Sequence, residues 1–360
     1  MSSDRPAVAP GEPRLLVAPA NFAGQGYAWS RAVTSHLAGA SAVCVEVGVG
    51  ALLMPTDQRI SPVVADGDGD WARQQLAWVS TNFSHVLLEA GRPLFGVLFH
   101  RDVGAEVEAL RDAGLAIALI AHGTDVRLPS RHADREPWSP FTPGVLADLV
   151  LREHRAREVA AVFAAFDGPT FVSTPDLLDD VPGATWCPVV VDAARWSELA
   201  APSPHMVPTV LHVPSRGPMK GSELVDPVMR RMDEAGLIRY HRANQVRSHQ
   251  MPEVVQAADI VLDQFRIGSY GVAACEAMAA GRVVVGHVRT DVRDRVRATT
   301  GLDLPIVEAT PDDVQDVVSG LAADPERRAR IGHEGRRYAS AVHDGRAAAQ
   351  ALRGWLSGSS

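Results

Sequence analysis

Long apolar runs are absent from this sequence, because no stretch of eighteen or more apolar residues occurs in its 360 residues. The first segment, residues 1–13, is polar and rich in proline and has no apolar centre. A transmembrane helix and a secretory signal both need such runs. We therefore expect neither of them, and we expect a cytoplasmic protein.

Cysteine is also scarce. The three cysteines, Cys44, Cys187 and Cys275, are odd in number and far apart in the sequence. That pattern fits neither a disulfide framework nor the ligand spacing of a zinc site. We predict that the three thiols are reduced and lie in the core.

Positive charge does not predominate. The formal net charge is -8, which argues against nucleic acid as the main partner because binding its backbone needs a basic surface. Lysine is almost missing, since Lys220 is the only lysine among 35 lysines and arginines. A compact ammonium on a flexible stem suits a phosphate group. Lys220 is therefore a candidate phosphate ligand, and a surface lysine retained by chance is the alternative.

Several signatures of other enzyme classes are missing. No Gly-x-Ser-x-Gly elbow, Walker A loop or His-Glu-x-x-His occurs, which disfavours hydrolases, phosphotransferases and zinc peptidases. Gly24 and Gly26 lack the third glycine of a dinucleotide fingerprint, because Trp29 stands there. The acidic run 66–70 fails as a calcium loop because Ala77 replaces the bidentate glutamate, and we predict a solvated turn.

Short apolar runs rich in valine, isoleucine and leucine alternate with amphipathic segments, which is typical of βαβ units and parallel sheets. The length favours two domains rather than one. We predict a boundary near the polar, proline-bearing stretch 197–208, with domains at 1–200 and 201–340. The segment 341–360 is predicted as a helix that packs back toward the first domain. The strands are expected at 14–20, 42–47, 85–89, 116–121, 170–173, 189–191, 209–213, 237–241, 260–263, 283–286 and 305–307.

The most specific stretch is 267–281, which reads Ile-Gly-Ser-Tyr-Gly-Val-Ala-Ala-Cys-Glu-Ala-Met-Ala-Ala-Gly before a valine-rich strand. Gly268 and Gly271 allow a sharp turn and a close approach of the backbone to a ligand. A helix that begins near Gly271 directs its free amides at this loop, which favours an anion. Glu276 lies among small apolar residues and needs a partner, for which a ribose diol is suitable. A glutamate on the helix surface is the alternative.

The block 268–286 resembles the C-terminal signature of retaining glycosyltransferases of family 4. Its usual form is a Glu-Gly-Phe-Gly loop, a second glutamate eight residues after the first, and Ala-Met-Ala-x-Gly. Lys220-Gly221 is similar to the diphosphate-binding Arg/Lys segment of that family. Val191-Asp192 with Trp196 is similar to the Val-Asp-x-x-x-Phe that closes the family's N-terminal domain. Residues 121–127 resemble its His-Gly-x-Asp.

The resemblance implies an α/β protein of the GT-B class, in which two doubly wound Rossmann-like domains face each other across a cleft. Glu276 would bind the ribose hydroxyls of a nucleotide sugar, while Arg216 and Lys220 would neutralise the diphosphate and the charge of the leaving group. The loop that would hold phosphate through its backbone amides consists of Ser269, Tyr270 and Gly271. The side chain of Tyr270 is predicted either to pack within the loop or to cover the phosphates.

Roles in the N-terminal domain follow in the same way. His122 would contact the donor sugar near its reacting carbon, and a buried histidine bonded to backbone is the alternative. Gly24 and Gly26 would line the opposite wall of the cleft. Asp125 would lie at the cleft edge, unless it only caps its loop. The loop 127–142 is predicted to shape the acceptor site.

The implied activity is metal-independent transfer of a sugar from a nucleotide diphosphate-sugar, which is a co-substrate, so that no cofactor and no metal site are expected. The acceptor would be a glycan, a lipid-linked molecule or a small molecule, and a lipid-linked acceptor would bring transient membrane association. Gly268 stands where the family has its first glutamate. This departure keeps two alternatives open, a non-catalytic member that binds a nucleotide sugar or glycan, and a nucleotide-sugar epimerase on the same fold.

Overall fold

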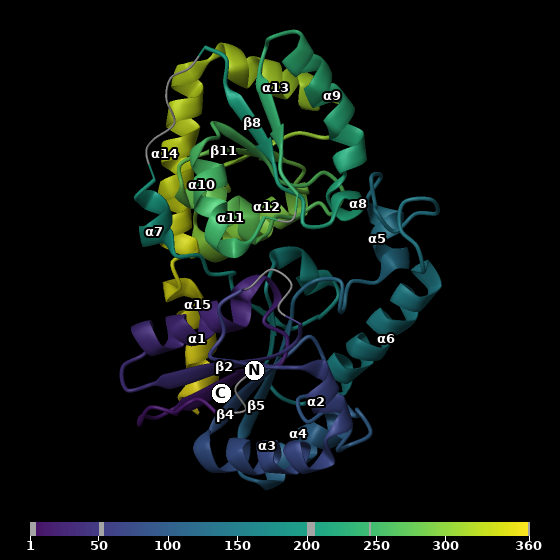
Figure 1. Cartoon of the computed structure of the whole chain (residues 1–360), viewed down its shortest axis with the longest axis vertical. Coiled ribbons are helices and arrows are strands. Elements are labelled where there is room, and N and C mark those ends of the chain that lie inside the picture. Colours follow the sequence, from purple (N-terminus) through teal and green to yellow (C-terminus); the bar gives the residue numbers. More distant parts are fainter. Residues whose placement is uncertain (1–4, 50–53, 200–205, 245, 359–360) are drawn as a thin grey trace. The chain divides into compact units, whose positions relative to one another are not determined.

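The structure is a computed structural model that describes residues 5–49, 54–199, 206–244 and 246–358. The chain divides into two compact units. Figure 1 shows that each unit contains a sheet with helices packed around it. Unit 1 comprises Met1–Leu128, His154–Val190 and Gly345–Ser360, and unit 2 comprises Pro129–Glu153 and Val191–Asp344.

Unit 1 is built on a parallel sheet in which the described strands have the order β3-β2-β1-β4-β5-β6-β7. Neighbouring strands pair residue by residue, for example Leu16 with Val86 and Leu87 with Ala118. The strands are almost continuous apolar runs because both faces of the sheet are buried. They are β1 Arg14–Ala18, β2 Ser41–Val47, β3 Gln58–Ile60, β4 His85–Glu89, β5 Ala116–Ala121, β6 Thr170–Val172 and β7 Thr185–Trp186.

One face of this sheet is covered by the first helix of unit 1 and by the last helix of the chain. Trp29 and Val33 of the first helix and Leu352 and Trp355 of the last one join Leu15 and other strand residues in one core cluster. The helices of unit 1 are α1 Gln25–His36, α2 Pro62–Gly67, α3 Gly69–Asn82, α4 Val103–Asp112 and α15 Arg346–Leu356, and α6 Leu149–Ala165 begins in unit 2 and continues into unit 1.

Unit 2 is built on a second parallel sheet, whose described strands have the order β12-β11-β10-β8-β9. They are β8 Thr209–His212, β9 Arg239–Arg242, β10 Ile260–Leu262, β11 Val283–Gly286 and β12 Ile306–Glu308. The helices of this unit are α5 Pro129–Arg135, α7 Ala193–Ser197, α8 Gly217–Lys220, α9 Ser222–Glu234, α10 Met251–Gln256, α11 Val272–Ala279, α12 Thr290–Thr300, α13 Val314–Ala323 and α14 Pro325–Val342.

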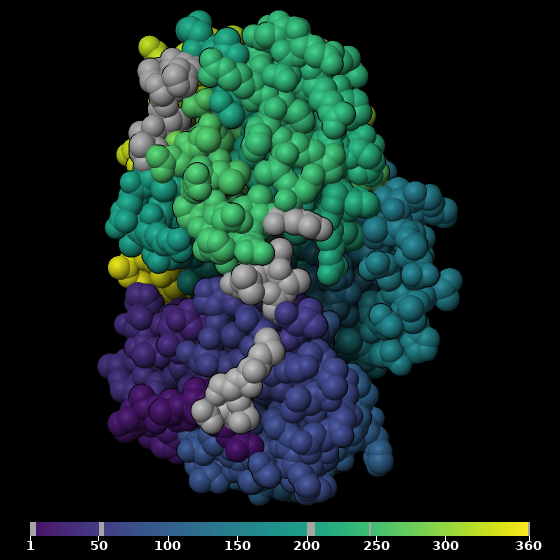
Figure 2. Space-filling view, viewed as in Figure 1, coloured from purple at the N-terminus to yellow at the C-terminus, as the bar shows by residue number. Residues whose placement is uncertain are grey.

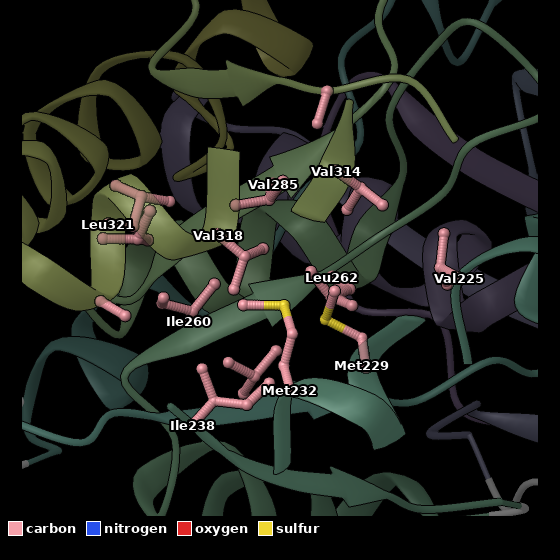
Figure 3. Close-up of a cluster of buried hydrophobic side chains, with 14 of the residues drawn as sticks. Val225, Met229, Met232, Ile238, Ile260, Leu262, Val285, Val314, Val318 and Leu321 are labelled. Atoms are coloured by element: carbon pink, nitrogen blue, oxygen red, sulfur yellow. The ribbon is translucent and has the colours of Figure 1, made fainter. Parts of the chain in front are cut away.

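The core of unit 2 lies between its sheet and the helices α9 and α13. Met229 and Met232 of α9 and Val318 of α13 pack against Ile260 and Leu262 of the central strand (Figure 3). Figure 2 shows residues 206–244 and 246–300 of this unit packed into one continuous surface. The other face of the sheet is covered by α11 and α14, which both contact β11.

One predicted strand is absent, and two short strands are present that were not predicted. Residues 189–191 form no strand, because the backbone N–H and C=O of Val190 are bonded to the side chain of Gln25 instead of a neighbouring strand. Trp29 donates in the same way to the carbonyl of Pro188. The edge strands β3 and β7 are only three and two residues long, respectively, and the sequence pattern does not reveal them. The other predicted strands are present with ends shifted by two residues or fewer.

The chain between Pro129 and Glu153 departs from the predicted division at residue 200. This segment, which contains most of the loop 127–142, packs within unit 2 and not within unit 1. Arg266 donates to the carbonyls of Trp138 and Ser139, and His132 is bonded to the carbonyl of Ile267. These bonds to the loop after β10 place the segment in unit 2.

Three further features bear on the sequence predictions. Cys44, Cys187 and Cys275 are free and buried, as predicted. In the acidic run 66–70, Asp68 caps α3 by accepting from the backbone of Asp70 and Trp71. Among the described helices, none has both the length and the apolar character that crossing a membrane requires.

We predict that α15 stabilises unit 1. Leu352→Ala removes a fully buried side chain and leaves a cavity, so the free energy of unfolding should fall by about 3 kcal/mol. Arg353→Ala in the same helix removes an exposed side chain and serves as the control. Urea unfolding followed by tryptophan fluorescence measures both. Equal stabilities of the two variants would contradict a core role for this helix.

Candidate functional site

The strand order of unit 2 reverses between β8 and β10. From β8 the chain moves outward to β9, and it then continues from β10 through β11 to β12 on the other side. In open parallel sheets ligands bind beyond the carboxyl ends of the strands at such a reversal. The segment with α8 follows β8, and the loop 263–271 with α11 follows β10. The candidate phosphate segment and the candidate phosphate loop therefore belong to neighbouring strand ends.

An ion pair joins these two strand ends. The Lys220 ammonium donates to Oδ1 of Asp263 over 2.7 Å, with the side chains 18% and 3% exposed. The other oxygen of Asp263 is buried and accepts no hydrogen bond from the residues that the structure describes. The backbone reinforces the junction, because Phe265 N–H donates to the carbonyl of Lys220. Lys220 is thus held in place while part of its side chain stays exposed.

His212, the last residue of β8, connects the elements that carry the candidate site residues of unit 2. Burial lowers the pKa of His212 to about 4, so its ring is neutral at pH 7. Its Nδ1 lies 3.0 Å from the carbonyl oxygen of Leu262, and its Nε2 lies 2.8 Å from Oγ of Ser222. The neutral ring therefore donates from Nδ1 and accepts at Nε2. It ties the end of β8 to β10 and to the start of α9.

Glu276 lies in α11 and is partly buried. Burial raises the pKa of Glu276 to about 7, although the positive charges of Lys220 and Arg195 act in the opposite direction. Within the described part of the chain, its carboxylate has no hydrogen-bond partner. A carboxylate with these neighbours can accept hydrogen bonds from a ligand that displaces water from it.

Gly268 has no room for the glutamate of the resembling family. Its φ is +69°, and a Cβ would lie 2.6 Å from Oε2 of Glu136 and 2.6 Å from Cγ of Arg289. The carboxylate in this space belongs to Glu136, which lies in the segment inserted from residues 129–153. Its partner is His287, 3.1 Å away. Burial opposes the charge of this ring, but hydrogen bonds to Glu136 and Glu308 raise the pKa of His287 to about 9.

Two side chains of the candidate phosphate loop, those of Ser269 and Tyr270, are buried. Tyr270 is 2% exposed, and its hydroxyl lies 3.2 Å from that of Tyr338, so the side chain packs inside unit 2 and does not cover a ligand. Ser269 is also buried, and its hydroxyl has no hydrogen-bond partner among the described residues. Gly271 is the N-cap of α11. Arg216, in contrast, is exposed at the N-cap of α8.

In unit 1 the strand order reverses between β1 and β4. Glu89, the last residue of β4, is fully buried at this point. Its Oε2 accepts from the backbone N–H groups of Ala20 and Asn21, each at 2.9 Å. Its Oε1 lies 2.9 Å from Nε2 of His122, which follows β5. His122 is therefore bonded to a side chain at the reversal and not to backbone alone.

Of the two predicted glycines of unit 1, only Gly26 lies beside the carboxylate of Glu89. A Cβ on Gly26 would lie 3.0 Å from both oxygens of Glu89 and 3.1 Å from Sγ of Cys44, so the helix α1 approaches the carboxylate closely only with glycine. Gly24 has a φ of +76° and faces Met54. Asp125 accepts from the backbone N–H groups of His122 and Gly123, and it therefore caps the loop.

The comparisons with known proteins agree with this architecture. Residues 215–354 match the family described as glycosyl transferase-like. The match begins just before Arg216 and includes Lys220 and Glu276. No curated protein sequence is similar to the chain.

Solved structures resemble nearly the whole chain. Sucrose-phosphate synthase from Thermosynechococcus elongatus is 14% identical, with 95% of this chain and 97% of that chain covered and a TM-score of 0.61. HepE from Anabaena, solved with UDP and glucose, is 12% identical, with coverage of 96% and 99% and a TM-score of 0.59. A protein from Listeria monocytogenes described as a UDP-N-acetylglucosamine 2-epimerase has 13% identity, coverage of 96% of both chains and a TM-score of 0.51.

This chain has the GT-B fold. Its two parallel-sheet α/β units match GT-B glycosyltransferase structures over nearly their whole length. The fold and the glycosyl transferase-like segment together support a glycosyltransferase. In the described ranges no group of three or more His, Cys, Asp or Glu residues is arranged to hold a metal ion.

The polar residues that contact the candidate site residues are not distinguished by the sequence pattern. Glu89 and Asp263 stand at the ends of predicted strands, and His212 stands inside one. A charged or polar residue that closes an apolar run marks the carboxyl end of a strand, where ligands bind in parallel sheets. That signal is present in the sequence at Glu89 and Asp263, but not at His212, which Val213 follows. Glu136 had no such signal, because it comes from a distant segment.

We predict that Glu276→Gln stabilises the protein at high pH. The folded-state pKa of about 7 lies above the ordinary 4.5, so the folded chain holds a proton between these values that the unfolded chain has lost. Stability should therefore fall as the pH rises from 4.5 to about 7, and it should stay lower above pH 7. The glutamine variant avoids this loss, which we expect to be on the order of 3 kcal/mol at pH 8.

Melting temperatures between pH 5 and pH 8 test this prediction. Glu234→Gln, at an exposed position of the same unit, is the control and should show no growing advantage. An advantage of the Glu276 variant that does not increase with pH would contradict the raised pKa.

We also predict that Gly26→Ala destabilises unit 1. The added methyl would press on the buried carboxylate of Glu89, and crowding of this kind costs about 1–3 kcal/mol. Gly67→Ala is the matched control because a Cβ there meets nothing within 4 Å. It should be neutral or slightly stabilising. The melting temperatures of the two variants in thermal unfolding test this prediction. Equal values would show that the space beside Glu89 can accommodate the added methyl group.

Proposed function

We propose that this protein is a retaining glycosyltransferase that moves a sugar from a nucleotide diphosphate-sugar to an acceptor hydroxyl without a metal ion. The observation that carries the proposal is the reversal point of unit 2, where α8 with Lys220 follows β8, α11 follows β10, and the charge of Lys220 acts on Glu276, all within the glycosyl transferase-like segment. The nucleotide is assigned to this unit.

The arrangement suits a diphosphate leaving group. Lys220 and Arg216 supply positive charge from the segment after β8, and α11 directs its first backbone N–H groups toward the same strand ends. Such fixed charges and dipoles stabilise the negative charge that develops on the phosphate when the bond to the sugar breaks. In this proposal they replace the metal ion.

Glu276 is assigned to the ribose. Its carboxylate has no hydrogen-bond partner within the described chain, and the two hydroxyls of a ribose can donate to its oxygens. Ionisation of Glu276 in the complex would be favoured by those bonds and by Lys220 and Arg195. The nucleotide should therefore bind more tightly as the pH rises toward 7.

The sugar and the acceptor are assigned to unit 1. His122 would contact the sugar near its reacting carbon, beside the loop that contains Gly24 and Gly26. The retaining outcome follows from the resemblance to family 4, and a glycan, a lipid-linked molecule or a small molecule can serve as acceptor. NMR of the anomeric proton of the first-formed product tests the stereochemistry.

Titration calorimetry with UDP in the presence of EDTA tests the donor site. Wild-type protein should bind, and Glu276→Gln or Arg216→Ala should each weaken binding about tenfold or more, as expected for a lost charge-assisted hydrogen bond. The side chain of Arg216 is exposed, so its loss should not disturb the fold. Arg231→Ala removes one exposed positive charge from α9 and is the control.

The outcomes separate the parts of the proposal. Unchanged affinity in both site variants would show that the nucleotide lies elsewhere, and binding that disappears with EDTA would contradict metal independence. GDP, ADP and dTDP are titrated in the same way to identify the base. Release of sugar onto an acceptor, and not inversion at one carbon of the bound sugar, distinguishes a transferase from an epimerase.

A further inference from the structure

Glu89 is a fully buried carboxylate that the proposed function does not yet use. We propose that Glu89 is a positioning residue, which holds the His122 ring in the tautomer with Nδ1 unprotonated so that this nitrogen accepts a hydroxyl of the sugar or acceptor. The reaction part of this inference rests on the proposed function. The tautomer itself does not depend on any substrate.

The hydrogen bonds around Glu89 determine which nitrogen carries the proton. A carboxylate has only acceptors, and Oε2 already receives the backbone N–H groups of Ala20 and Asn21. The contact of 2.9 Å between Oε1 and His122 therefore requires a hydrogen on Nε2. In a neutral imidazole the proton is then absent from Nδ1. The carboxylate thus selects one of the two tautomers.

The surroundings hold the ring in this orientation. Trp29 and Phe22 each lie with their ring centroids 5.2 Å from that of His122. The backbone N–H of His122 donates to Asp125, and its carbonyl accepts from the hydroxyl of Ser173. Nδ1 has no hydrogen-bond partner in the residues that the structure describes. It is the one ring nitrogen left without a partner there, in a side chain that is 7% exposed.

The same bond decides what Nδ1 can do toward a hydroxyl. With the hydrogen on Nε2, Nδ1 accepts a hydrogen bond from the hydroxyl, whereas a ring with its hydrogen on Nδ1 could only donate there. An amide at position 89 would not select the accepting tautomer. Positioning by Glu89 would therefore appear in the rate of turnover and not in the binding of the nucleotide.

A second buried glutamate in unit 1, Glu106, allows the positioning of a histidine to be distinguished from the anchoring of a loop. Glu106 is also fully buried and accepts the backbone N–H groups of Leu94 and Phe95, at 2.8 and 3.0 Å. No imidazole bond to Glu106 occurs among the described residues. Each glutamate ties down a loop with two amides, but only Glu89 also binds a histidine. Glu106→Gln is therefore the matched control.

Glu89→Gln is the decisive variant. Its amide oxygen must accept from Ala20 and Asn21, because the reverse orientation would set an NH₂ group against two N–H donors. The NH₂ group then faces Nε2 of His122 and forces the proton onto Nδ1. Long-range ¹H–¹⁵N NMR of the imidazoles at pH 7.5 reads the tautomer, with His122→Asn to assign the signals.

We expect Nε2–H in the wild type and in Glu106→Gln, and Nδ1–H in Glu89→Gln. The same tautomer in the wild type and Glu89→Gln would overturn the proposal. Circular dichroism and thermal unfolding confirm that each variant is folded. If Glu89→Gln does not fold, the wild-type spectrum still decides, because an unprotonated Nε2 would contradict the bond to Glu89.

Turnover of the nucleotide sugar that binds in the titrations tests the role in the reaction. We expect kcat of Glu89→Gln to fall by about 10²-fold with an unchanged Kd for UDP, and Glu106→Gln to keep the wild-type kcat. An unchanged kcat with an inverted tautomer would refute the role in transfer. A wild-type protein that binds no nucleotide would instead overturn the proposed function and leave the tautomer result standing.

Discussion

Each unit buries a carboxylate at the point where its strand order reverses, and this constraint organises the surrounding residues. Glu89 closes β4 in unit 1, and Asp263 follows β10 in unit 2. Both strands are the first on the far side of their reversal. A buried charge is costly unless it is partnered. Two backbone amides and His122 compensate Glu89, whereas the ammonium of Lys220 compensates Asp263.

The difference between the two partners explains the different chemistry of the units. In unit 2 the partner is a cation, so the reversal keeps a positive group beside the N-terminus of α11 and suits an anion. In unit 1 the partner is an imidazole whose other nitrogen has no bond within the described chain, which suits a neutral hydroxyl. The chain's only lysine therefore balances Asp263 and at the same time remains partly exposed.

Much of the fold follows from local patterns, and the candidate site follows in part. Valine-rich runs such as 283–286 specify buried parallel strands because both of their faces need apolar residues. Strands β3 and β7 were not predictable, since runs of three residues or fewer carry no period. Residues 189–191 have the composition of a strand, but Gln25 provides their hydrogen bonds. Composition does not reveal a competing partner of that kind.

Local composition was sufficient to select the loop 268–271 and Lys220 as candidates, because glycines, a helix start and a rare lysine are properties of short segments. The tertiary structure alone decided the partners: Glu136 beside Gly268, Asp263 beside Lys220 and Glu89 beside His122. These pairs join residues that are 33 to 132 positions apart in the chain. Contacts of this kind arise from packing and charge compensation between whole elements, which no short segment encodes.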